Sequence, residues 1–203
     1  MNPYHQEQIE AYAMVRQHLN NNRSTYQDLL AIVADYLAFR EQVDNFLSTH
    51  FSTVCTQTCY RNRLSACCSR EGVVTFFADV VVNVLVSEPL EIENLISILR
   101  EPNTGFKCVY LTEEGCRWKV KPIVCEMFLC DRAKESIFLE NSTLKQEWEL
   151  IEAGRKLYTW PDQPVLFDKL EAYFIKNGSQ SPLMYLHNSP GLLRIKQRAG
   201  LIR

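Results

Sequence analysis

Residues 26–47 read YQDLLAIVADYLAFREQVDNFL, and this stretch decides the fold class. Its apolar residues recur every three or four positions, which is the spacing of one face of an α-helix. They are Tyr26, Leu29, Leu30, Val33, Leu37, Val43, Phe46 and Leu47. A helix with such a stripe is stabilised by burying it against other elements, so the stretch predicts a long core helix. We expect Ser24 and Gln27 to form a capping box where it begins.

The remaining sequence outside the cysteines also favours helices. Asn2-Pro3 opens a helix that runs to about Asn20, and Asn177-Gly178 ends another. Further helices are expected over residues 71–86, 90–100, 133–157 and 164–176, with short ones opening at Pro182 and Pro190. Residues 71–86 are rich in valine, so a strand is the alternative there. We therefore predict an all-α single domain over residues 1–203, with irregular cysteine-rich loops.

The composition limits the classes of protein to which this sequence can belong. A chain of 203 residues, 46% of them hydrophobic, can build a full core without help from metals. A net charge of −2 argues against general attraction to nucleic acid or anionic membranes. The most apolar run, Val73 to Val86, is shorter than the roughly 20 residues of a membrane span. The N-terminus lacks a signal-peptide pattern, so we expect the cytoplasm, where thiols stay reduced.

The cysteines are the main functional signal. All eight lie between residues 55 and 130, as two sequence groups of four. They are Cys55, Cys59, Cys67 and Cys68, followed by Cys108, Cys116, Cys125 and Cys130. Four thiolates close a tetrahedral zinc site or anchor an iron–sulfur cluster. The clustering therefore predicts that these eight residues are metal ligands.

The spacing suggests how the ligands divide. Cys55 and Cys59, at i and i+4, share one face of a helical turn. Cys67 and Cys68 are adjacent, so their side chains diverge and serve two metals or two corners of one cluster. The two spatial groups consequently need not be the two sequence groups.

The cysteines have three other interpretations. Structural disulfides would need an export signal, and unrelated buried thiols would scatter along the chain. A redox or nucleophilic cysteine usually needs a Cys-x-x-Cys motif, which the sequence lacks, or a partner histidine. His50, the histidine nearest to the cysteines in sequence, is either an accessory ligand or the end of the long helix.

Other residues near the cysteines have two interpretations each. Bound thiolates leave excess negative charge, and neighbouring cations could compensate it or be ordinary surface charge. These are Arg61, Arg63, Arg70, Arg117, Lys119 and Lys121. Glu113, Glu114 and Glu126 are interpreted as solvated acids rather than acid–base catalysts. Trp118, Trp148 and Trp160 are interpreted as core residues.

Read in order, the cysteine pattern resembles the YkgJ-type cysteine-cluster family, described as a zinc- or iron-chelating domain. The first half of that pattern is two cysteines, a doublet and a turn into a helix. Here these are Cys55, Cys59, Cys67-Cys68 and then Ser69 to Leu85. The second half corresponds to Cys108-Val109-Tyr110-Leu111, Glu113-Glu114-Gly115-Cys116, Pro122-Ile123-Val124-Cys125 and Cys130. The gap between Cys59 and Cys67 is longer than in the family, and Lys121-Pro122 replaces its frequent Arg-Pro. The resemblance implies metal binding.

These observations favour a metal-binding protein without catalysis of its own. A glycine-rich phosphate loop, a His-Glu-x-x-His helix and a Gly-x-Ser-x-Gly elbow are all absent from the sequence. The alternative is an iron–sulfur protein for electron transfer or for protein modification, because similar clusters occur in the larger flagellin lysine N-methylases.

A third hypothesis concerns the C-terminus. No acid follows Glu171, whereas five basic residues do: Lys176, Arg194, Lys196, Arg198 and Arg203. The ordinary interpretation is a solvated tail, and the alternative is docking on a protein partner or on nucleic acid.

Overall fold

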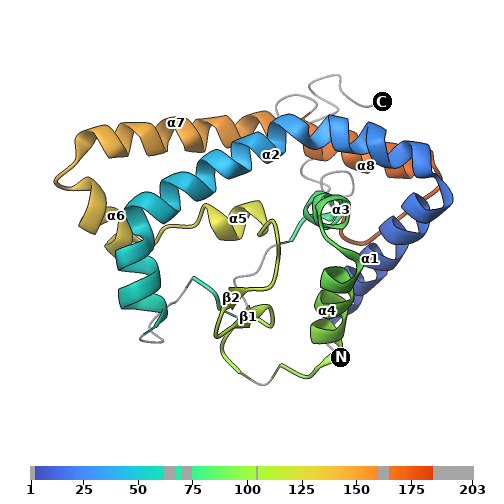
Figure 1. Ribbon diagram of the computed structural model, residues 1–203, viewed down its shortest axis with the longest axis horizontal. Helices are drawn as coiled ribbons and strands as arrows, with labels where there is room; N and C mark the ends of the chain where they lie inside the picture. Colours follow the sequence, from blue (N-terminus) through green and yellow to red (C-terminus); the bar gives the residue numbers. More distant parts are fainter. Residues whose placement is uncertain (1–2, 62–66, 70–74, 104, 160–164, 185–203) are drawn as a thin grey trace.

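The computed structural model describes residues 3–61, 67–69, 75–103, 105–159 and 165–184. Helices account for most of these residues, which confirms the all-α prediction (Figure 1). The α-helices are α1 (Pro3–Asn21), α2 (Arg23–Phe51), α3 (Phe77–Val86), α4 (Pro89–Arg100), α5 (Ile123–Glu126), α6 (Asp131–Phe138), α7 (Ser142–Thr159) and α8 (Leu166–Lys176). A π-helix, η1 (Ser52–Tyr60), continues α2, and a two-stranded antiparallel hairpin pairs β1 (Leu111–Thr112) with β2 (Gly115–Cys116).

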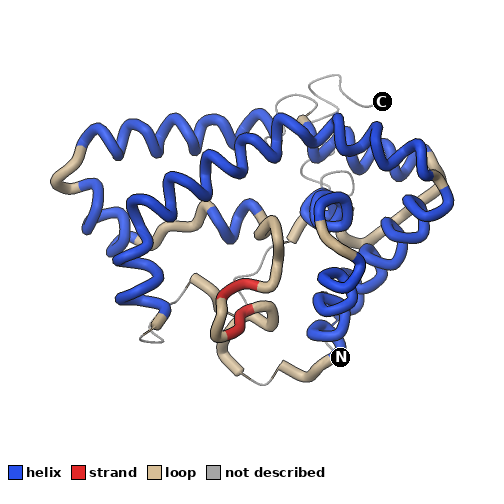
Figure 2. Tube along the Cα trace, in the orientation of Figure 1, coloured by secondary structure: helices blue, strands red, loops and turns tan. Residues whose placement is uncertain are grey.

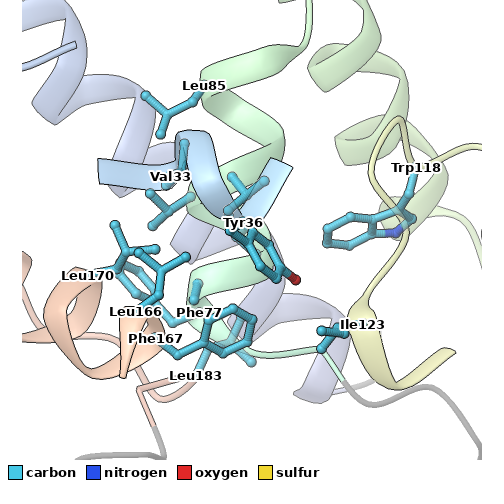
Figure 3. Packing of buried hydrophobic residues seen from close by; sticks show 14 of the residues in the cluster. Val33, Tyr36, Phe77, Leu85, Trp118, Ile123, Leu166, Phe167, Leu170 and Leu183 are labelled. Carbon is cyan, nitrogen blue, oxygen red and sulfur yellow. The ribbon is translucent and has the colours of Figure 1, made fainter. Parts of the chain in front are cut away.

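The long helix α2 organises the molecule, as its apolar stripe predicts. Leu29, Val33, Val43 and Phe46 are buried in the core, and Tyr36 and Arg40 fill the same stripe between them. Figure 1 shows α7 and α8 lying along α2, while α1 and α4 stand beside α3. Figure 3 shows Val33 and Tyr36 of α2 packed among side chains of α3 and α8.

The ends of several helices differ from the predictions. Helix α2 begins at Arg23 with Asn22 as its N-cap, so Ser24 lies inside the first turn and the predicted capping box is wrong. The helix predicted over 133–157 is two helices, because Asn141 interrupts it. The Oδ1 atom of Asn141 accepts a hydrogen bond from the N–H of Leu144 (3.1 Å) and caps α7.

Other predictions are confirmed or fall outside the described residues. The valine-rich segment is helical from Phe77, whereas residues 70–74 are not described. Helix α8 ends as predicted, with Gly178 in the left-handed region at φ 80°. Pro182 lies in a turn in which the N–H of Met184 bonds the carbonyl of Ser181, rather than in a helix. Pro190, Trp160 and the basic residues after Lys176 are outside the described ranges.

The segment that carries the cysteines lies on one side of the helical body. Figure 2 shows the hairpin beneath α5, with the chain entering it from the end of α4 and leaving it towards α5. The hydroxyl of Tyr60, the last residue of η1, donates to the carbonyl of Thr112 and joins η1 to the hairpin. Within the described part of the chain, no helix combines the length and apolarity needed to cross a membrane.

Candidate metal centre

Cys55 and Cys59 lie on η1, where the helix widens. The N–H of Arg61 donates to the carbonyl of Thr56 (3.1 Å), five residues earlier, as a π-helix requires. Positions i and i+4 still share a face in this wider turn, so both thiols point the same way, as their spacing predicts. Every residue of η1 is at least partly exposed to solvent. π-Helical turns are rare and often occur at functional sites.

Four thiols from three segments form one neighbourhood, which we call the outer thiol group: Cys55, Cys59, Cys67 and Cys130. Burial, with the nearby charges of Cys67 and Cys130 adding to it, raises the pKa of the Cys55 thiol to about 11. The same three causes raise the pKa of Cys59. Cys67 and Cys130 are exposed, and Cys130 is the N-cap residue of α6.

A second neighbourhood, the inner thiol group, contains Cys68, Cys108 and Cys116. The hydrogen bond with Cys67 and burial raise the pKa of Cys68, and the charges of Cys108 and Cys116 raise it further. Each thiol of this group is partly buried. Cys68 therefore lies near Cys108 and Cys116 of the second sequence group as well as near Cys67, and the spatial grouping cuts across the sequence groups.

The doublet is itself an interacting pair. The thiol of Cys68 donates a hydrogen bond to the sulfur of Cys67 and thereby lowers the pKa of Cys67 to about 6. Lys107, nearby, lowers it as well. Cys67 is therefore the thiol of the pair that ionises more readily.

Backbone hydrogen bonds hold the inner segments together. The N–H of Cys108 donates to the carbonyl of Cys68 (2.9 Å), and Ser69 and Lys107 form an antiparallel bridge. In the hairpin, Leu111 pairs with Cys116. The hairpin was not predicted, because two-residue strands leave no alternation to detect, although Gly115 at φ 120° marks its turn.

Backbone N–H groups also point at two inner sulfurs. The N–H groups of Tyr110 and Leu111 lie near the sulfur of Cys108, and the N–H of Trp118 lies near that of Cys116. The N–H of Leu111 also donates to the carbonyl of Cys108 (3.1 Å). The N–H groups near the sulfurs favour the thiolate, but burial outweighs them and raises the pKa of Cys108 to about 11. Hydrogen bonds from backbone N–H groups orient and stabilise thiolate ligands.

Two polar residues of α3 fix the segment that leads to Cys125. Asn83 is fully buried, and its amide donates to the carbonyl of Val120 (2.6 Å) and accepts from the N–H of Val120 (3.1 Å). Asp79 accepts from the N–H of Ile123 at the start of α5 (3.3 Å) and from the N–H of Phe76 (2.9 Å). The residues that interrupt the most apolar run of the sequence therefore bind the cysteine-bearing segment to the core.

Arg40 of α2 fixes the same segment from the other side. Its Nε donates to Glu126 (3.0 Å) and its Nη2 to the carbonyl of Lys121 (2.6 Å). The side chains of Arg40 and Glu126 are only 4% and 6% exposed. Glu126 is therefore a buried ion-pair partner, and its interpretation as a solvated acid is wrong. Arg40 was missed because it sits within an otherwise apolar helix face, where a buried partner cannot be read from the sequence.

The basic residues contribute differently from the prediction. Arg117 pairs with Glu114 (3.4 Å) and Lys119 with Glu91 (3.3 Å), so both act as surface charges. Lys121 pairs with Glu126 (3.4 Å) and also lowers the pKa of Cys116. Arg61 is exposed, and Arg63 and Arg70 lie outside the described residues.

Two cations that sequence reasoning missed face the outer thiol group. Burial raises the pKa of Cys59, and the charges of Arg132 and Lys107 offset part of this rise. Arg132 follows Cys130 by two positions, and Lys107 directly precedes Cys108. Their closeness to cysteines in the sequence is the signal that could have identified them.

The remaining candidates have structural roles. The ring of His50 packs on Phe46, with ring centroids 4.9 Å apart, one residue before the end of α2. Trp118 and Trp148 are buried in the core, which confirms their prediction. Glu113 and Glu114 are exposed, as predicted.

All eight cysteines are free thiols, and they suit a metal that prefers thiolate ligands. Within the described ranges, no three Cys, His, Asp or Glu side chains already stand in ligand geometry. The structure thus brings seven cysteines into two neighbourhoods, but neither neighbourhood has the geometry of a metal site. Cys125, partly buried on α5, follows the segment fixed by Asn83 and Arg40. Comparison with known proteins found no matching family model, curated protein or solved structure.

Proposed function

We propose that this protein binds two metal ions through its eight cysteine thiolates and that metal binding, rather than catalysis, is its role. The observation that carries the proposal is the gathering of thiols from distant segments into two groups, which meet at the adjacent Cys67 and Cys68. Cys125 completes the inner thiol group, because its segment is tied to the core directly after Cys116. Each metal then has four thiolate ligands.

Zinc is the metal that we propose first. A four-thiolate zinc site is closed and has no open coordination position, which suits a non-catalytic role. Two zinc ions with eight thiolates leave four negative charges. Lys107 and Arg132 beside the outer thiol group and Lys121 beside Cys116 offset part of this charge. The function belongs in the cytoplasm, where thiols remain reduced and available to metal.

An iron–sulfur protein is the second candidate. The N–H groups directed at the sulfurs of Cys108 and Cys116 favour it, because such bonds tune the reduction potentials of iron–sulfur clusters. In that case the protein would transfer electrons or assist a protein modification together with a partner.

The proposal is tested on protein isolated without oxygen or chelator. Zinc, iron and acid-labile sulfide are measured per chain. We expect two zinc ions and a colourless protein. Iron and sulfide in a brown protein that absorbs at about 400 nm would favour the iron–sulfur protein over the zinc protein. A chain isolated without any metal would overturn both.

A further inference from the structure

The outer side of α7 exposes two large apolar side chains. Leu150 is 74% exposed and Leu157 is 62% exposed, although the same helix buries Trp148 and Ile151 in the core. The two leucines are seven positions apart, so they lie two turns apart on one side of the helix. Ala153 lies between them and is also exposed. We call the surface formed by Leu150, Ala153 and Leu157 the α7 strip.

The inner side of α7 is already occupied by the rest of the molecule. The ring of Trp148 stacks on that of Phe46 of α2, with centroids 5.5 Å apart, and the hydroxyl of Tyr158 donates to the carbonyl of Asp35 (3.2 Å). Figure 1 shows α7 along the upper edge of the molecule, with α2 beneath it. A single exposed leucine is ordinary, whereas leucines aligned along an outer helix face form an apolar strip that a partner can cover.

Two opposite charges flank the strip. Glu149 directly precedes Leu150 and Lys156 directly precedes Leu157, so both charged residues lie on the same flank, and both are exposed. Within the chain, Glu149 lies 3.9 Å from Lys145, and both of these side chains are more than half exposed. Such an exposed pair contributes little and leaves Glu149 available to another cation. The strip therefore has an acid near one end and a base near the other.

This arrangement of charges is complementary to a second copy of itself. A twofold axis near Ala153 places Leu150 of one copy close to Leu157 of the other. The same axis brings Glu149 of each copy beside Lys156 of the other, which makes two pairs of opposite charge. In a parallel pair of helices each charge would stand at the height of its identical counterpart. The charges therefore select the antiparallel orientation.

We propose that two copies of this protein associate through their α7 strips, antiparallel about a twofold axis near Ala153. The strip is only two turns long and is smaller than the roughly 800 Å² per partner of a standard interface. Glu147, one turn before Leu150, lines a groove of about 470 Å³ between α7 and α2, which offers the second copy further surface. The dimer is therefore reversible, with a dissociation constant in the micromolar range. The inference does not depend on metal binding.

Sedimentation equilibrium of the full chain, from micromolar to submillimolar concentration, tests the proposal. Reductant is present because Cys67 and Cys130 are exposed and could link two copies by disulfides. The dimer fraction should rise with concentration and should be the same with and without chelator. A monomer over the whole range would overturn the proposal. A dimer that chelator dissociates would do so too, because metal rather than α7 would then join the copies.

Leucine variants locate the interface. Leu150→Ala and Leu157→Ala should each raise the dissociation constant at least about tenfold, because each truncates a central contact. Leu90→Ala is the matched control, since Leu90 is 71% exposed on α4, and it should leave the constant unchanged. Circular dichroism checks that each variant keeps its helices. If neither α7 variant weakened the dimer more than the control, the interface would lie elsewhere and the proposal would fail.

Charge exchange tests the orientation. Glu149→Lys or Lys156→Glu alone sets like charges against each other at both ends of the strip and should weaken the dimer. The double variant exchanges the two signs and should restore it. Low ionic strength is the condition of choice, because exposed charges are then least screened. A double variant that dimerises no better than the single variants would exclude the antiparallel arrangement.

Discussion

Cys67 and Cys68 are the adjacent cysteines at which the outer and inner thiol groups meet. Their side chains lie in the outer and inner thiol groups respectively, while the thiol of Cys68 still reaches the sulfur of Cys67. The adjacency was visible in the sequence, but the prediction that the two side chains diverge is wrong, because the thiol of Cys68 hydrogen-bonds the sulfur of Cys67. Which other cysteines join each of them depends on chain folding over many residues, so sequence spacing alone could not assign them.

Pairs of cysteine variants test this division. Cys67→Ser and Cys68→Ser should each lose one of two metal ions, and the double variant should lose both. The variant that combines Cys67→Ser with Cys130→Ser should lose only one ion, because both ligands belong to the outer thiol group. Metal content per chain is the measurement, and Thr53→Ser on η1 is the control. Equal losses in the two double variants would contradict the division.

Asp79 should make the free energy of unfolding depend on pH, in a direction that follows from its pKa. Burial is the main reason that its pKa is raised from 3.8 to about 6. The folded-state pKa lies above the unfolded value, so the folded protein binds the proton more tightly. Stability from this group is therefore full below about pH 4 and is lost as the pH rises towards 6, by up to about 3 kcal/mol.

Denaturant unfolding with chelator and reductant present checks the sign. The free energy of unfolding of the natural chain, minus that of Asp79→Asn, should fall between pH 4 and pH 6. A difference that stays constant or rises over this range would show that the buried carboxyl does not titrate as described.

At the scale of elements, α2 and α5 are joined by the buried pair of Arg40 and Glu126. Replacing Arg40 by leucine leaves a buried carboxylate without its main partner and should cost about 3 kcal/mol in free energy of unfolding. Arg40→Leu combined with Glu126→Leu should cost less, because no buried charge remains. Urea unfolding measures both, and a double variant less stable than Arg40→Leu would exclude this account.

The break between α6 and α7 depends on one cap. Asn141→Ala removes the bond to the N–H of Leu144 and should lower the free energy of unfolding by about 1 kcal/mol. Asn141→Ser keeps a capping oxygen and should restore most of that loss in the same urea titrations. Equal stability of the alanine and serine variants would mean that the cap contributes nothing.

Most elements could be predicted from apolar periodicity, because each long helix buries one face. The stripe of α2 and the positions of α4 and α8 follow from it directly. The break at Asn141 was missed because periodicity continues across it, and the cap acts through one local hydrogen bond. η1 was missed for a different reason, since a π-helix differs from an α-helix by its hydrogen-bond spacing and has no separate sequence pattern.

At the scale of the whole molecule, the helical body and the cysteine-bearing segment have different sources of stability. The body has a core of apolar side chains that extends from Ala11 to Met184. We therefore expect chelation to leave most of the helical circular dichroism signal unchanged and to increase proteolysis between residues 55 and 130. Loss of the helical signal on metal removal would show instead that the core depends on the metal.

The eight cysteines could be named as candidate ligands from the sequence, because clustering and donor chemistry are local properties, and their binding of a metal stays a prediction. The buried supports could not, since Asp79, Asn83 and Arg40 appear in the sequence only as polar interruptions of apolar stretches. Their partners lie 37 to 86 residues away along the chain. Such pairs are created by the tertiary fold.

X-ray absorption at the metal edge, on protein isolated without oxygen, tests the central claim most directly. It reports which atoms surround the bound metal. We predict a first shell of four sulfur atoms per ion, at about 2.3 Å for zinc. A shell of nitrogen or oxygen atoms, or the absence of bound metal, would contradict binding by the eight cysteines.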